Sequence, residues 1–135
     1  MSELFEKGLA NRKATLGDEY VDRAIDGATD FTREFQQMMT EYCWGACWGR
    51  DALTPRDRSL IVLAILGTLG RSEEFALHFR SAFNNGVTEE ELKDLLFHVT
   101  VYAGVPAGVE GFRIGRRVLE EREQEGTAQE GKAQR

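Results

Sequence analysis

Residues 53–70 read LTPRDRSLIVLAILGTLG, and this stretch decides the fold class. Its start carries two helix signals: Thr54 is a predicted N-cap, and Pro55 takes the first helical position, where its missing N–H costs nothing. Gly70 is the predicted stop at the other end. Between these signals, the run from Leu60 to Leu66 is apolar almost all round. The pattern predicts a central buried helix that neighbouring helices, or another subunit, must cover.

Helical signals continue on both sides of this stretch, from about residue 18 to residue 122, and no alternation typical of strands interrupts them. Further helix starts are predicted at Asp18, Asp30 and Ser72. After Asp30 the apolar residues recur at helical spacing and predict an amphipathic stripe for the core; they are Phe31, Phe35, Met38, Met39 and Tyr42.

Three further helices are predicted toward the two ends of the chain. Thr88 and Glu91 form a predicted capping box, and the last helix is expected from about Pro106 to Glu120. One short helix is expected within the first 17 residues. The sequence therefore predicts an all-α fold of six to seven helices.

The length and charge limit the classes of function. A chain of 135 residues and 15.2 kDa suits one domain, expected over 1–122, followed by a polar tail over 123–135 that is predicted to be disordered. A net charge of −6 argues against nucleic-acid binding. No apolar run has the roughly 18 residues of a membrane helix. Two cysteines without an export signal indicate reduced thiols and a cytoplasmic location.

His78 and His98 are the two histidines of the chain, and histidine is the usual general acid or base near neutral pH. His78 borders the apolar face of Phe75 and Phe79, and His98 shares a helical face with Tyr102. The spacing leaves open whether each histidine is catalytic or a hydrogen-bonded structural residue.

The aromatic and arginine residues near position 50 suggest a pocket rim. Trp44 and Trp48 form a predicted aromatic wall, a feature more often found in a core or a subunit interface than in a ligand site. Arg50 follows this wall, and Arg58 belongs to the same arginine cluster in an otherwise acidic chain. Arginine is well suited to bind a carboxylate through two hydrogen bonds.

Cys43 and Cys47 have C-x3-C spacing, which differs from the C-x2-C of a thioredoxin-like redox site. A zinc site needs about four ligands, and no second pair lies near in the sequence. We therefore interpret both cysteines as small buried apolar residues beside the tryptophans, in preference to a redox or metal role.

These motifs together resemble the γ-carboxymuconolactone decarboxylase family, over about residues 8 to 118. The resemblance rests on seven motifs: Leu16-Gly17-Asp18-Glu19-Tyr20-Val21, Glu41-Tyr42-Cys43-Trp44-Gly45, Trp48-x-Arg50, Arg56-x-x-Ser59-Leu60, Leu77-His78-x-Arg80-x-Ala82, Asn84-Asn85-Gly86-Val87-Thr88 and His98-x3-Tyr102-x-Gly104-x-Pro106. It implies the all-α alkylhydroperoxidase D-like fold and a homo-oligomer, either a trimer or a hexamer. It also implies cofactor-free, metal-free decarboxylation of 4-carboxymuconolactone to 3-oxoadipate enol-lactone, in protocatechuate catabolism.

The implied substrate is a dicarboxylate lactone that serves as its own electron sink, because loss of CO2 leaves a dienolate. The resemblance and the residue types together suggest the roles. Arg50 or Arg58 would hold the remaining carboxylate, and Tyr102 or an arginine would stabilise the enolate oxygen. His78, or else His98, would protonate carbon. The departing carboxylate would lie against Trp44, Trp48 or Phe79, and Glu41 is a further substrate-binding candidate.

Two other functions remain open. One is a thiol-dependent peroxidase or disulfide reductase of the same fold, in which His78 would be the histidine of a C-x2-C-x3-H motif. The cysteine positions of that motif are occupied here by Arg71 and Glu74, which argues against this function. The other is a non-catalytic oligomeric module.

Overall fold

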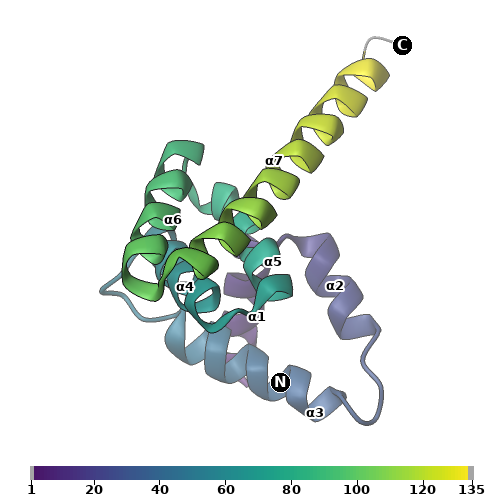
Figure 1. The fold of residues 1–135 in the computed structure, drawn as a ribbon. Helices are drawn as coiled ribbons and strands as arrows, with labels where there is room; N and C mark the ends of the chain where they lie inside the picture. Colours follow the sequence, from purple (N-terminus) through teal and green to yellow (C-terminus); the bar gives the residue numbers. More distant parts are fainter. Residues whose placement is uncertain (1, 134–135) are drawn as a thin grey trace.

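The computed structural model describes residues 2–133, and within them the chain is helical and contains no strand (Figure 1). The prediction of an all-α fold with six to seven helices is confirmed, because the described residues form seven α-helices. The elements are α1 (Glu3–Leu16), α2 (Asp18–Asp26), α3 (Arg33–Met39), the π-helix η1 (Thr40–Cys47), α4 (Pro55–Leu69), α5 (Ser72–Ala82), the 3-10 turn η2 (Phe83–Asn85), α6 (Glu89–Ala103) and α7 (Val105–Ala133). None of the described helices has the length and apolar character needed to cross a membrane.

The predicted ends of α4 are confirmed. The Thr54 hydroxyl accepts a hydrogen bond from the Asp57 N–H at 3.1 Å, and Gly70 closes the helix with φ of 72°, in the left-handed region that glycine tolerates best. The capping box of α6 is also present, because Thr88 and Glu91 exchange hydrogen bonds between side chain and backbone.

Within the single chain, the predicted central helix α4 is covered by neighbouring helices on one side only. Leu63 is fully buried, whereas Ile61 and Ile65 on the opposite side are exposed. The core lies between α4, α5, α6 and α7, and its largest members are Leu63, Phe75, Phe79, Leu92 and Ile114. One side of α4 packs into this core, and the other is left uncovered.

The N-terminal third forms a second packed unit, in which α1 lies directly against η1. The two backbones approach so closely at Gly8 that a side-chain carbon there would clash with the carbonyl oxygen of Thr40. The Asn11 amide donates to the carbonyl of Trp44 at 2.9 Å and ties the same two helices together. The position of Trp44 is therefore fixed by α1.

The amphipathic stripe predicted after Asp30 does not belong to the core. Phe31 is 94% exposed, and Phe35, Met38 and Tyr42 are exposed as well. The helix α3 is short and lies at the outer edge of the molecule, where α2 and α3 form an arm beside the helical body (Figure 1). No neighbouring helix of the described chain covers this stripe.

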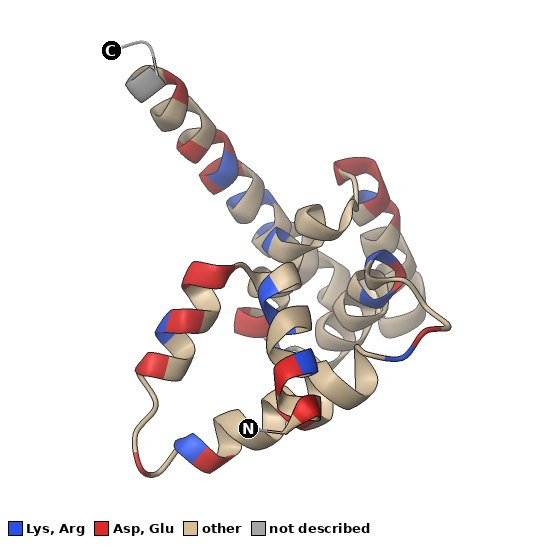
Figure 2. Cartoon of the chain, turned by 180° about the vertical axis from the view of Figure 1, so that it is seen from behind, with Lys and Arg blue, Asp and Glu red and all other residues tan. Residues whose placement is uncertain are grey.

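The C-terminal segment differs from the predicted disordered tail. The helix α7 continues past Glu120 to Ala133 and projects from the body, with acidic and basic residues along the projecting part (Figure 2). Arg80 on α5 pairs with Glu121 and Glu125, which anchors the first turns of this extension. The extent of the domain, 1–122, stays a prediction.

Candidate active site

His78 lies on α5 and stacks against Trp44 of η1. The two ring centroids are 6.1 Å apart, and the planes differ by only 9°. Trp44 in turn contacts Trp48, with a centroid distance of 4.7 Å, and both indoles are buried. The predicted aromatic wall therefore exists, and it faces a candidate catalytic histidine.

The His78 ring carries an unused hydrogen-bonding atom. Its Nδ1 is buried and has no hydrogen-bond partner in the part of the chain that the structure describes. Burial lowers the pKa of His78 from 6.5 to about 4, and the Glu74 carboxylate one turn earlier opposes this shift. His78 is therefore neutral near pH 7, and its Nδ1 is left without a hydrogen-bond partner among the described residues. Glu74 was missed in the sequence, although its i, i+4 spacing to His78 could have indicated it.

Arg50 and Arg58 meet at the start of α4. The Arg58 guanidinium donates to the carbonyl oxygen of Arg50 at 2.9 Å, while Arg58 itself is only 8% exposed. The Nε of Arg58 is buried without a partner, and no carboxylate pairs with either arginine among residues 2–133. A buried guanidinium without an acidic partner, as in Arg58, is a candidate group for binding an anion.

His98 and Tyr102 form a separate pair on α6. Their rings lie 5.0 Å apart, and Tyr102 is 81% exposed. Both residues line a hollow of about 610 Å³ between α4 and α6, whose floor includes Leu60 and Val99. His78 does not line this hollow, so the structure does not bring the two candidate histidines into one site.

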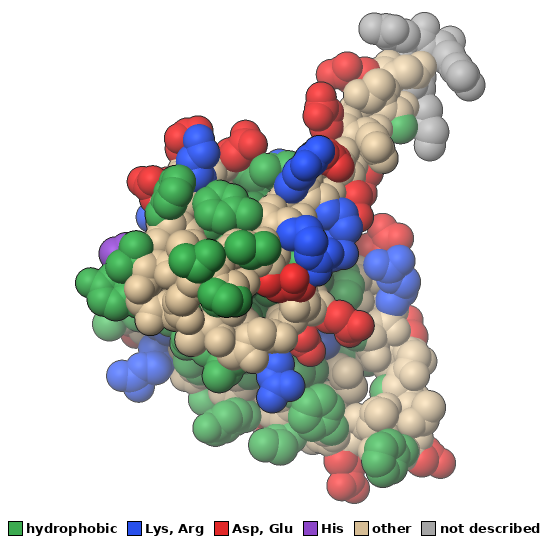
Figure 3. All heavy atoms as spheres, viewed as in Figure 1, with side chains coloured by type: hydrophobic (Ala, Val, Ile, Leu, Met, Phe, Trp, Pro, Cys, Tyr) green, Lys and Arg blue, Asp and Glu red, His purple; other side chains and the backbone are tan. Residues whose placement is uncertain are grey.

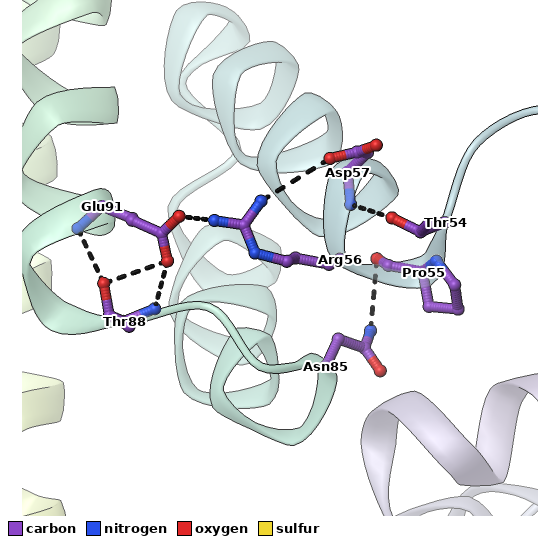
Figure 4. A network of polar contacts seen from close by, with 7 residues as sticks. All are labelled: Thr54, Pro55, Arg56, Asp57, Asn85, Thr88 and Glu91. Carbon is purple, nitrogen blue, oxygen red and sulfur yellow. Dashed lines mark hydrogen bonds and ion pairs between the residues drawn. The ribbon is translucent and has the colours of Figure 1, made fainter.

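A polar network closes one end of the hollow between α4 and α6. Arg56 forms an ion pair with Glu91 and lies near Asp57, while Asn85 donates to the carbonyl of Pro55 (Figure 4). Arg56 is thus neutralised by acidic neighbours, unlike Arg50 and Arg58.

Glu41 lies on η1 but is not placed with His78. Its carboxylate accepts a hydrogen bond from the Ser2 hydroxyl at 3.1 Å. A hollow of about 740 Å³ between α2, α5 and α7 is lined by Leu77 and Arg80 but not by His78. Size alone therefore does not identify the chemical site. Among the described residues no cluster of three or more His, Cys, Asp or Glu side chains is arranged to hold a metal ion.

By its fold and its histidine site, this chain is a small all-α protein in which a desolvated histidine packs against an aromatic wall. Comparison with known sequences gives the family. Residues 33–117 match the carboxymuconolactone decarboxylase family, and the chain belongs to it.

Two curated relatives match most of the chain. The 4-carboxymuconolactone decarboxylase of Acinetobacter baylyi is 38% identical over 117 residues, which cover 87% of each chain. The nitrosuccinic acid decarboxylase of Metarhizium robertsii is 38% identical over 116 residues, covering 86% of this chain and 81% of the relative. Both relatives are decarboxylases by name, and the predicted family is confirmed.

Proposed function

We propose that this protein is a decarboxylase that converts 4-carboxymuconolactone to 3-oxoadipate enol-lactone in protocatechuate catabolism, without a cofactor. Similarity to the Acinetobacter baylyi enzyme over 87% of both chains supports the substrate. The structural observation that carries the proposal is His78, a half-buried histidine with an unpaired Nδ1 stacked on Trp44.

The chemistry needs three groups and one environment. When the carboxylate on the γ-carbon leaves as CO2, its bonding electrons move through the ring double bond to the lactone carbonyl. A cation must hold the carboxylate that stays, and a hydrogen-bond donor must stabilise the enolate oxygen. An acid must then protonate the α-carbon. An apolar surface around the departing carboxylate favours its conversion to neutral CO2.

In this proposal His78 delivers the proton. Because its pKa is about 4 in the free chain, His78 is almost wholly neutral at pH 7 and must gain a proton as substrate binds. A substrate with two carboxylates placed beside the ring would raise that pKa, since a neighbouring negative charge favours the imidazolium. Binding would therefore supply the acid only when a substrate anion is present.

Residues near His78 and near the start of α4 are proposed to bind the retained carboxylate and to surround the departing one. Arg50 and Arg58, which have no acidic partners in the described chain, are proposed to hold the retained carboxylate. Trp44 and Trp48 are proposed as the apolar wall for the departing one. His98 and Tyr102 remain the second candidate pair for proton transfer, and Glu41 remains a substrate-binding candidate; the hollow beside α6 is where that pair would act.

A second substrate is favoured by the second relative. Nitrosuccinate is also a small dicarboxylate, and loss of CO2 beside its nitro group would leave a nitronate. In the nitronate, as in the dienolate, the electron pair left by CO2 is delocalised onto oxygen. The same three groups would serve both reactions. The 38% identity to the nitrosuccinic acid decarboxylase makes this the competing candidate.

An assay of the purified protein on both compounds tests the proposal. We expect loss of the conjugated lactone chromophore, with a kcat/KM for 4-carboxymuconolactone well above that for nitrosuccinate. Faster turnover of nitrosuccinate would replace the proposed substrate, and no activity on either compound would refute decarboxylation as the function. Mass spectrometry of the product distinguishes decarboxylation from lactone hydrolysis.

We also propose that the protein is a cytoplasmic homo-oligomer, a trimer or a hexamer. Apolar side chains gather on the surface formed by α4, α6 and the start of α7 (Figure 3). They include Ile61, Ile65, Leu69, Phe97, Val101, Val105 and Val109. Exposed apolar side chains gathered on one face in this way are typical of a subunit interface.

A further inference from the structure

The two cysteines of the chain share the π-helix η1 with its two tryptophans. The backbone N–H of Trp48 donates to the backbone carbonyl of Cys43 at 3.0 Å. This bond joins residues i and i+5 and encloses the segment from Cys43 to Cys47. A turn closed in this way holds more residues than an α-helical turn. Residues i and i+4 lie on the same side of such a helix, and the two thiols are close enough for Cys47 to influence the ionisation of Cys43.

The two thiols differ in their surroundings. Both are free, with Cys47 exposed to solvent and Cys43 half-buried, so the interpretation of both cysteines as buried apolar residues is wrong for Cys47. Burial raises the pKa of the Cys43 thiol; Cys47 acts in the same direction, and the nearby Arg12 guanidinium opposes it. Cys47 is thus accessible to a reagent from solution, whereas Cys43 is shielded behind it.

Arg12 is an unexplained buried cation beside this pair. It is only 3% exposed and donates to the Gln36 amide oxygen at 3.0 Å and to the Thr40 hydroxyl at 3.3 Å. Its Nε has no partner, and within residues 2–133 it forms no ion pair. A buried charge without a counter-ion is costly. A thiolate formed transiently at Cys43 would supply that counter-ion.

We propose that Cys43 and Cys47 are a dithiol modification site, which hydroperoxides oxidise to an intramolecular disulfide. The Cys47 thiolate attacks the peroxide, the O–O bond breaks, and an alcohol or water leaves with the thiol proton, giving a sulfenic acid. The Cys43 sulfur then attacks the Cys47 sulfur, the S–O bond breaks, and water leaves with the Cys43 proton. Two electrons pass from the two thiols to one peroxide.

Closing the disulfide must move η1. Side chains four residues apart on a helix have Cβ atoms about 5–6 Å apart, whereas a disulfide needs roughly 3.5–4.5 Å. Trp44 directly follows Cys43 and is held against His78, so contraction of the turn alters the Trp44–His78 stack. If the proposed decarboxylase function holds, oxidation lowers that activity.

The test uses hydrogen peroxide on the purified full-length protein, with three readouts independent of catalysis. We expect loss of both thiols per chain, an intact mass lower by two hydrogen atoms, and a change in intrinsic fluorescence, all reversed by dithiothreitol. The fluorescence is specific because Trp44 and Trp48 are the two tryptophans of the chain. The matched control is Cys47→Ser, which should show no change in fluorescence with peroxide.

Three results would overturn the proposal: loss of a single thiol, covalent dimers on a non-reducing gel, or a disulfide that leaves the fluorescence unchanged. In the activity arm, oxidation should lower kcat by about tenfold or more, since small displacements in a catalytic site have effects of that size. The double variant Cys43→Ser, Cys47→Ser should keep the activity of the reduced protein and resist peroxide. Absence of decarboxylation in the reduced protein would refute the proposed function alone, because the thiol and fluorescence results would stand.

Discussion

At the scale of the residue, His78 is the side chain on which the proposed chemistry depends. A positioned acid that protonates carbon contributes about 10²–10⁴-fold to the rate. We expect His78→Gln to lower kcat by that factor while the melting temperature changes by only a few degrees, since glutamine has a similar volume. The measurement is steady-state kinetics beside thermal unfolding. The matched control is His98→Gln, and a larger fall in kcat for this variant would move the acid role to the α6 pair.

His78 also predicts how stability depends on pH. Its pKa is about 4 in the folded chain and 6.5 in an unfolded one, so the unfolded state binds the proton more readily. The free energy of unfolding is therefore highest above pH 6.5 and falls as the pH drops toward 4. For this one group we expect a loss of about 2 kcal/mol between pH 7 and pH 5. Urea unfolding at both pH values measures it, and His78→Gln should remove that part of the loss. An equal loss in the variant would contradict the desolvation of His78.

Substitution of Arg50 and of Arg58 should distinguish an effect on substrate binding from an effect on folding stability. Arg50 is exposed, so Arg50→Ala should raise KM more than it lowers kcat, with little change in melting temperature. Arg58 is buried and holds the Arg50 carbonyl, so Arg58→Ala should also cost about 1–3 kcal/mol of folding free energy. Kinetics and urea unfolding of the two variants make the comparison. An unchanged KM in both variants would show that neither arginine binds the substrate carboxylate.

At the scale of the element, capping decides where the helices begin. The capping box of Thr88 and Glu91 lies beside Arg56, which reaches Glu91 from α4, so the start of α6 is tied to a second helix. We expect Thr88→Ala to lower the free energy of unfolding by about 1 kcal/mol. Thr127→Ala on the exposed part of α7 is the control and should change it by a few tenths at most. A loss below that of the control would show that the cap contributes nothing.

The π-helix η1 is the element that joins the site to the rest of the fold. It carries Trp44 and Trp48, rests on α1 at Gly8, and receives the buried Arg12 through Thr40. An α-helical register would rotate Trp44 relative to α5, because each turn would then hold fewer residues. The stack on His78 thus depends on this irregular segment, which agrees with the frequent occurrence of π-helical turns at functional sites.

At the scale of the whole molecule, the uncovered apolar surface of α4, α6 and α7 predicts association. Val101 is 76% exposed on this surface. We expect light scattering of the wild-type protein to give a mass three or six times that of the 15.2 kDa chain, and Val101→Asp to lower it. Thr127→Asp, on the projecting end of α7, is the control and should leave the mass unchanged. A stable monomer at micromolar concentration would refute the proposed oligomer.

The sequence by itself determined the local structure. The caps at Thr54 and Thr88, the stop at Gly70 and the all-α class follow from interactions within a few residues, so local chemistry predicts them. The sequence missed the helical extension of α7, because the ion pairs of Arg80 with Glu121 and Glu125 join residues more than forty positions apart.

Only the tertiary structure decided which candidates meet. It placed His78 against Trp44, and His98 with Tyr102 in a different hollow, although all four residues have equally suggestive side chains. It also showed that the stripe from Phe31 to Tyr42 faces outward. Helical spacing says that residues share a side of a helix, but not what that side packs against. The partner is set by how distant helices cross, and that depends on the packing of the entire chain.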